Sequence, residues 1–211
     1  MTRAPLRFDE AVEHTRTGDL WLFRGRKLAD QAIRVTTNSP VNHVGMAVVV
    51  DDLPPLMWHA ELGRSLPDMW SGGHQRGVQL HDLYDAVVVW ATRYGQRAWL
   101  RQIHPAVTKE MEAAVLRTIA RLDGTPFPST AGLASRWLRG RARREAGLET
   151  AYCAEVVAQT YAAMGLVEER LPVNWYDPGS FWSGDGLRLE QGWTLSPEIE
   201  VAVPGPGPGL D

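Results

Sequence analysis

The stretch Thr150-Ala-Tyr-Cys-Ala-Glu-Val-Val-Ala-Gln-Thr-Tyr-Ala-Ala-Met164 decides the fold that the sequence predicts. Its larger apolar residues recur at helical spacing, and alanines fill the positions between them. Thr150 is suited to cap the N-terminus of a helix, and Gly165 is suited to end it. The pattern therefore predicts one helix over this stretch, with Cys153, the only cysteine of the chain, in its first turn.

The position of Cys153 allows two interpretations. Free backbone N–H groups and the positive end of the helix dipole favour a thiolate, and the pKa of cysteines at helix N-termini can fall from about 8.5 to roughly 3.5–7.5. The same N–H groups can bind the oxyanion that forms when a thiolate attacks a carbonyl. The alternative is a buried cysteine that packs as a small apolar residue. A nucleophile also needs a base and a group that orients the base, so histidines and acids elsewhere in the chain matter.

Length and composition predict a single domain with a real core, because the chain has 211 residues of which 44% are hydrophobic. A net charge of −3 gives no global nucleic-acid signature. One cysteine excludes an intramolecular disulfide and a multi-cysteine zinc site, and it fits a reducing compartment. The N-terminus has no apolar signal-peptide core. We therefore expect a cytoplasmic protein with one domain over residues 1–203 and a disordered Pro/Gly tail over 204–211.

Two neighbouring stretches combine strand patterns with polar side chains. Val41–Val50 is rich in β-branched residues and predicts a central strand buried on both faces, with His43 at its entrance. Leu56–Leu62 predicts a hairpin partner, on which alternation places His59 and Glu61 on the same face. Further predicted strands are 20–23, 77–81, 86–92 and 193–203, and further predicted helices are 26–35 and 108–122.

Two other groups of residues give weaker signals. Arg136, Arg139, Arg141, Arg143 and Arg144 fit contact with phosphates or an anionic membrane surface, although a solvated basic face is the alternative. The remaining histidines, His14, His74, His81 and His104, have no partner at an informative spacing and are predicted to lie on the surface or in turns. No spacing of metal ligands and no phosphate-binding glycine loop is present in the sequence, so no metal or cofactor is expected.

The order of these features, with the histidine strand before the cysteine helix, resembles the circularly permuted branch of the NlpC-like papain superfamily. YiiX-like and lecithin:retinol acyltransferase-like proteins belong to this branch. The resemblance extends over roughly residues 17–182. The similar stretches are Gly18-Asp-Leu20, Ser39-Pro-Val-Asn-His43-Val-Gly45, His59-Ala-Glu61, Gly124-Thr-Pro-Phe127, Tyr152-Cys-Ala-Glu-Val-Val157 and Asp177-Pro-Gly-Ser-Phe181.

The resemblance implies an α+β, papain-like domain with an antiparallel sheet flanked by helices. It also implies that Cys153 is the nucleophile and His43 is the base. By analogy with YiiX-like proteins, Glu61 is the third group, which accepts the far ring N–H of the base and stabilises the imidazolium. His59 is the rival for this role, because some relatives use a histidine there. Residues that are candidates for lining the site are Tyr152, Asn42, Tyr176 and His59.

The function that follows is a cysteine hydrolase of the amidase or peptidase type, which cleaves amide or ester bonds through an acyl-thioester intermediate. Its substrate is a peptide, an amide or an acyl lipid, and no nucleic-acid partner is expected. The mechanism requires His43 within hydrogen-bond reach of Cys153 and a thiol pKa below that of free cysteine. The alternatives are a lipid acylhydrolase or acyltransferase, and a non-catalytic binding module on the same fold.

Overall fold

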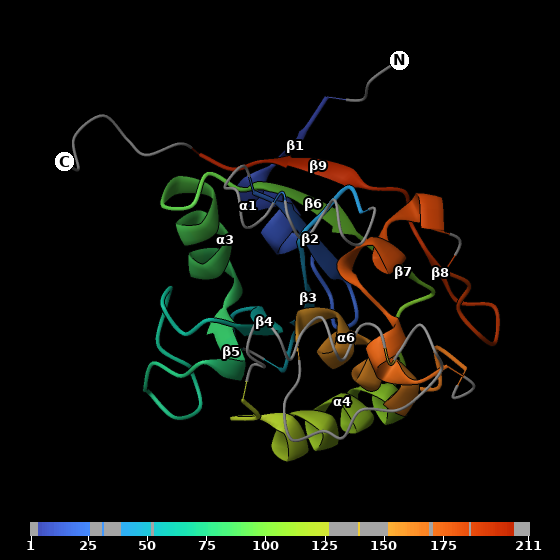
Figure 1. Ribbon diagram of the computed structural model, residues 1–211. Helices are drawn as coiled ribbons and strands as arrows, with labels where there is room; N and C mark the ends of the chain where they lie inside the picture. Colours follow the sequence, from blue (N-terminus) through green and yellow to red (C-terminus); the bar gives the residue numbers. More distant parts are fainter. Residues whose placement is uncertain are drawn as a thin grey trace.

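A seven-stranded sheet forms the centre of the computed structural model, which describes residues 4–25, 31, 39–51, 53–126, 139, 152–168, 171–185 and 187–204 (Figure 1). The strand order is β1-β9-β6-β2-β3-β4-β5, with β1 and β9 parallel and all other neighbours antiparallel. The strands are β1 (Leu6–Arg7), β2 (Leu20–Arg24), β3 (His43–Val48), β4 (Leu56–Glu61), β5 (Gly77–Asp82), β6 (Arg97–Arg101) and β9 (Ile199–Ala202). A mostly antiparallel sheet flanked by helices confirms the predicted α+β class.

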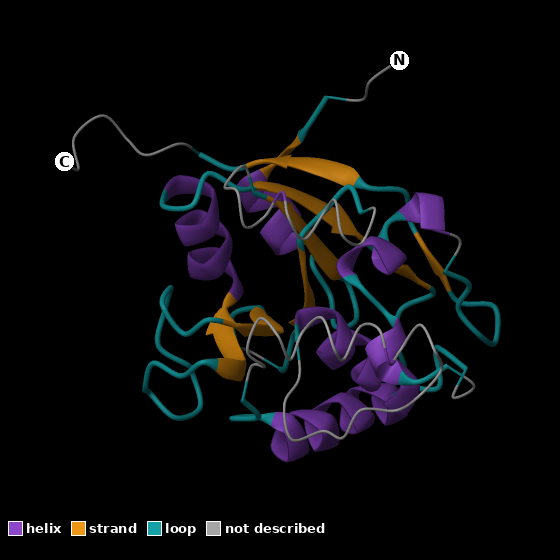
Figure 2. Ribbon diagram, viewed as in Figure 1, coloured by secondary structure: helices purple, strands orange, loops and turns teal. Residues whose placement is uncertain are grey.

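Helices cover both faces of this sheet (Figure 2). On one face, here called the α6 face, α4 (Lys109–Leu122) and α6 (Cys153–Ala163) pack against alternate strand residues such as Leu20, Val44 and Trp58. On the other, the α3 face, α1 (Phe8–Glu13) and α3 (Leu83–Thr92) pack against the intervening residues. In the described ranges, the remaining elements are β7 (Ile103–His104) with β8 (Thr194–Leu195), and the 3₁₀ helices η1 (Val173–Trp175), η2 (Pro178–Phe181) and η3 (Ser183–Asp185).

The start of α6 confirms the position of the cysteine, because Cys153 is the first residue of the helix. The cap differs from the prediction, because Tyr152 is the N-cap residue and its backbone N–H donates to Glu155 Oε2 over 3.3 Å. Thr150 lies outside the described residues. Gly165, with a φ of +73°, follows the last turn as predicted, since this left-handed conformation suits glycine.

Helix α4 follows the sequence closely. The Thr108 hydroxyl accepts the backbone N–H of Met111 over 3.3 Å, which caps the helix start. The apolar face predicted from helical spacing is the buried one, from Met111 to Leu122. Of the predicted strands, 20–23, 56–62 and 77–81 correspond to β2, β4 and β5, and the strand over Val41–Val50 corresponds to β3.

One predicted strand is wrong. Residues 86–92 belong to helix α3, although Val87, Val88 and Val89 favour a strand by propensity. The helix is favoured over a strand because the Asp82 carboxylate accepts the backbone N–H of Asp85 over 3.0 Å and so caps the helix start. Its buried residues, Leu83, Ala86, Val87 and Trp90, also recur at helical spacing. Strand β6, which the sequence did not predict, follows this helix, and the predicted strand 193–203 is divided into β8 and β9.

Several predictions fall on residues outside the described ranges. These are most of the helix over 26–35, the tail over 205–211, and Arg136, Arg141, Arg143 and Arg144 of the basic segment. Arg139 is described and is exposed. Within the described ranges, no helix combines the length and the apolar character needed to cross a membrane.

Candidate functional site

Three histidines from three adjacent strands lie side by side on the α3 face. His43 is the first residue of β3, His59 lies on β4 and His81 lies on β5. His59 and His81 are fully buried, whereas His43 is partly exposed. Because side chains alternate along a strand, all three lie on the face opposite to the neighbouring core residues Val44, Trp58 and Leu80.

Each ring is hydrogen-bonded to the next one, and the last ring is hydrogen-bonded to the side-chain amide of Gln79. His43 Nε2 lies 3.2 Å from His59 Nδ1, and His59 Nε2 lies 3.0 Å from His81 Nδ1. His81 Nε2 in turn lies 3.1 Å from Gln79 Oε1. The indole of Trp90, from α3, packs edge-on against the first two rings, with centroids 4.4 Å from His43 and 4.9 Å from His59. This set, His43, His59, His81 and Gln79, is called the histidine file below.

Burial keeps the histidine file neutral at pH 7. Desolvation, with the charge of His81, lowers the pKa of His43 to about 3. The pKa of His59 is lowered well below its ordinary value by desolvation and by both neighbouring histidines. Desolvation also lowers the pKa of His81 to about 4, although the Asp68 carboxylate and the Leu66 backbone act in the opposite direction. Each ring therefore carries one N–H and one lone pair, as a file of N–H···N bonds requires.

Cys153 lies on the other side of the sheet. The residue is 5% exposed and belongs to the apolar cluster of the α6 face, together with Val44. Val44 and His43 are consecutive in β3, so their side chains point to opposite faces. The structure thus places the Cys153 thiol and the His43 imidazole on opposite faces of the sheet and does not bring them together.

The environment of Cys153 does not activate the thiol. Desolvation raises its pKa to about 11, although hydrogen bonds with the backbone of Val44 and of the helix start act in the opposite direction. The thiol pKa below that of free cysteine, expected from the helix start, is therefore not found. The physical reason is that burial among apolar side chains outweighs the N–H groups of the first turn.

Glu61, predicted as the third catalytic group, faces the turn that follows β4 rather than His43. Desolvation raises its pKa, and hydrogen bonds with Ser65, Gly63 and Arg64 act in the opposite direction. Within the described residues, its buried Oε1 atom has no hydrogen-bond partner. Of the two rivals for orienting His43, His59 is the one that is hydrogen-bonded to it.

The other candidate residues lie outside the histidine file. Tyr152 and Tyr176 are buried beside Cys153 on the α6 face, where the Tyr152 hydroxyl donates to the Tyr176 carbonyl. Asn42 directly precedes β3, and its Oδ1 accepts the backbone N–H of Gly25 over 2.6 Å. Asn42 therefore fixes the approach of the chain to His43.

His81 and Gln79 are the members of the file that sequence reasoning missed. His81 was predicted to lie on the surface or in a turn, and this is wrong, because it is fully buried on β5. His14, His74 and His104 are exposed, as predicted. The sequence pattern that could have identified Gln79 and His81 is the alternation within the predicted strand 77–81, which places both residues on one face of the strand. Only the pairing of β5 with β4, which aligns His59 with Gln79, brings them to the site.

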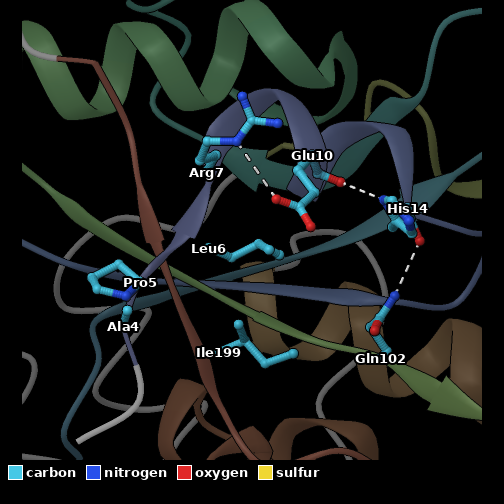
Figure 3. A pocket seen from close by; sticks show the side chains of 8 residues that line it. All are labelled: Ala4, Pro5, Leu6, Arg7, Glu10, His14, Gln102 and Ile199. Carbon is cyan, nitrogen blue, oxygen red and sulfur yellow. Dashed lines mark hydrogen bonds and ion pairs between the residues drawn. The ribbon is translucent and has the colours of Figure 1, made fainter.

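A surface cavity lies elsewhere (Figure 3). It has a volume of about 380 Å³ and lies near α1 and β9. Its lining residues are Ala4, Pro5, Leu6, Arg7, Glu10, His14, Gln102 and Ile199. None of them belongs to the histidine file, so this cavity adds no chemistry to the site. In the described part of the chain, no group of three or more His, Cys, Asp and Glu residues is placed to hold a metal ion.

Comparison with known proteins finds little. No protein-family model matches the sequence, and no curated protein matches it. Among solved structures, the metalloprotein YiiX from Escherichia coli O157:H7 is similar, with 20% identity and a TM-score of 0.49. The similarity covers 70% of this chain and 64% of that one, so this chain spans less than two thirds of the YiiX structure. A likeness at this level assigns no activity and no site residue.

Proposed function

We propose that this chain is a hydrolase of amide or ester bonds in which His43 is the general base. The observation that carries the proposal is the hydrogen bond from His43 to the buried His59, which continues to His81. It fixes the orientation of the His43 ring, and a partly exposed neutral imidazole offers a lone pair to a substrate. General bases of this kind typically contribute about 10²–10⁴-fold to the rate.

In the proposed reaction, His43 accepts a proton from the nucleophile as the nucleophile attacks the carbonyl carbon. The tetrahedral oxyanion then collapses, the bond to the amine or alcohol breaks, and the leaving group takes the proton back from His43. His59 has the role of the third group, because its Nδ1 faces His43 Nε2 and stabilises the imidazolium. With a pKa of about 3, His43 is a weak base at rest, and the anion that develops beside it raises this pKa.

Cys153 is the nucleophile that the resemblance implies, and it acts in one form of the proposal. In that form, a water molecule then hydrolyses the acyl-thioester, with His43 accepting the proton of the water and returning it to the sulfur. Backbone N–H groups at the start of α6 suit an oxyanion. However, the thiol and the His43 ring lie on opposite faces of β3, so this form requires a second conformation in which they meet. Water is the nucleophile in the other form, which the partial exposure of His43 favours.

A substrate screen tests the proposal and separates its two forms. Wild type, His43→Ala, Cys153→Ala and, as a matched control, the exposed His14→Ala are assayed on peptides, esters and acyl lipids. We expect turnover that His43→Ala lowers by about 10²–10⁴-fold and His14→Ala leaves unchanged. Loss of turnover and of a trapped acyl adduct in Cys153→Ala assigns the thiol, and retention assigns water. Equal turnover in wild type and His43→Ala would contradict the proposal.

A non-catalytic binding module is the second candidate. It is favoured by one observation, the buried Cys153 whose pKa is raised to about 11. This candidate expects no turnover of any substrate class in the screen, with all four proteins folded.

A further inference from the structure

We infer that Gln79 sets the tautomers of all three histidines and so leaves His43 Nδ1 as the open lone pair of the file. The orientation of the Gln79 amide is the first step. Its nitrogen lies 3.1 Å from the Gln75 carbonyl oxygen and 3.2 Å from that of Gly77. Two acceptors face this atom, so it must be the NH₂ group, and the atom that faces His81 must be the amide oxygen.

The second step follows each proton along the file. Gln79 Oε1 can only accept, so His81 Nε2 carries the N–H of that ring and His81 Nδ1 keeps the lone pair. His59 Nε2 must then donate to His81 Nδ1, which leaves a lone pair on His59 Nδ1. By the same reasoning His43 Nε2 donates to His59, and His43 Nδ1 remains without a proton. The opposite polarity would place an N–H at His43 Nδ1 and remove the base.

Burial makes this control effective. Gln79, His81 and His59 are fully buried, so none of these three side chains can exchange its hydrogen bond for one with bulk water. A buried donor left without an acceptor destabilises the fold, and this cost selects one polarity of the file over the other.

The consequence for catalysis rests on the proposed function. A proton accepted at His43 Nδ1 makes this ring an imidazolium, which can pass its Nε2 proton to His59 Nδ1. His59 can pass its own Nε2 proton to His81 Nδ1, and the positive charge then lies on His81. There the Asp68 carboxylate stabilises it. Gln79 is thus a positioning residue for His43, although three rings separate it from the reacting atom.

Nitrogen NMR of the imidazole rings in the wild-type protein at pH 7 tests the tautomers directly. We expect all three rings to carry the proton on Nε2 and to have an unprotonated Nδ1. A proton on Nδ1 of His43, His59 or His81 would overturn the inference. The measurement needs no substrate, so its failure is distinct from a failure of the proposed function.

Variants then test Gln79 itself. Gln79→Met removes the acceptor at similar size, and we expect part of the population to carry Nδ1–H. Gln79→Glu keeps an acceptor, so Nε2–H is retained and the pKa of His81 rises. Gln102→Met, outside the file, is the matched control and should leave the spectrum unchanged. Thermal unfolding shows whether each variant is folded; unchanged tautomers in folded Gln79→Met, or Nδ1–H in Gln79→Glu, would overturn the role of Gln79.

If the proposed function also holds, the turnover of Gln79→Met should fall in proportion to the fraction of molecules with Nδ1–H on His43, with KM unchanged. A fall in turnover without any change of tautomer would show a merely structural role for Gln79.

Discussion

Neighbouring residues of the same strands form the two faces of the sheet, and the two faces differ in polarity. On the α6 face, Trp58 packs in the apolar cluster with Cys153, and its indole N–H donates to the Thr160 hydroxyl over 3.1 Å. On the α3 face, the next residue, His59, is the centre of the histidine file. Adjacent residues of one strand therefore belong to an apolar core and to a polar file, because alternation separates them.

Burial favours the neutral form of the titratable groups on both faces, and the two faces differ in how these groups are hydrogen-bonded. Desolvation raises the pKa of the Cys153 thiol and lowers the pKa of all three histidines, so each group is held in its neutral form. The histidines nevertheless have their ring nitrogens paired in order, which leaves a directed lone pair at one end. A reactive residue type is therefore not sufficient for chemistry, because a buried group also needs hydrogen-bond partners in a fixed order.

The largest expected effect concerns the residue that orients His43. His59→Ala removes the hydrogen bond to His43, and turnover should fall on the order of 100-fold or more if His43 is the base. Glu61→Gln should change turnover little, because the carboxylate faces the turn after β4. Steady-state kinetics on a substrate found in the screen measures both. The reverse ranking would return the role of third group to Glu61.

The sequence predicted where the strands of the site lie, but it did not predict which helix covers each of their faces. The β-branched run around His43 and the alternation of His59 with Glu61 were sufficient to place β3 and β4. Which face the distant helix α6 covers was not readable, because either face of a buried strand is apolar enough to receive it. Here Val44 rather than His43 faces Cys153. His81 was missed because its role depends on the pairing of β5 with β4, which is a long-range contact.

The second prediction concerns the pH dependence of stability on the α3 face. Between pH 4 and 6.5 the unfolded chain protonates His81 and the folded one does not, so the unfolded state binds more protons there. The free energy of unfolding therefore rises with pH in this window, and the contribution of His81 is lost as pH falls from 6.5 toward 4, by on the order of 3 kcal/mol.

The contribution of Asp19 to the pH dependence of stability has the opposite sign and must be measured separately. Burial raises its pKa from 3.8 to about 6, so the folded state binds more protons and stability falls as pH rises through that window. Urea unfolding of wild type, His81→Gln and Asp19→Asn between pH 4 and 7.5 measures each slope. His81→Gln should lose part of the rise with pH, whereas Asp19→Asn should steepen it. Identical slopes in wild type and His81→Gln would contradict the assignment.

The third prediction concerns the thiol of the α6 face. Because burial raises the pKa of Cys153 from 9.0 to about 11, the thiolate fraction at pH 7 should be about 100-fold below that of an ordinary cysteine. Alkylation with iodoacetamide should be slow in the folded protein and become fast in urea. An inflection of the folded-state rate below about 8.5 would show an activated thiol, and it would restore the lowered pKa expected from the helix start.

The smallest expected effect tests whether the two faces are independent. Thr160→Val keeps the shape of the side chain and removes the hydroxyl that accepts the Trp58 indole N–H. Both side chains are fully buried, so the unpaired donor should lower the free energy of unfolding by about 1–3 kcal/mol. Trp58 and His59 are consecutive, yet the tautomers of the histidine file should be unchanged, because their side chains point to opposite faces. Urea unfolding gives the loss of stability, and imidazole nitrogen NMR gives the tautomers. A tautomer change in Thr160→Val would show that the α6 face and the histidine file are coupled through the backbone of β4.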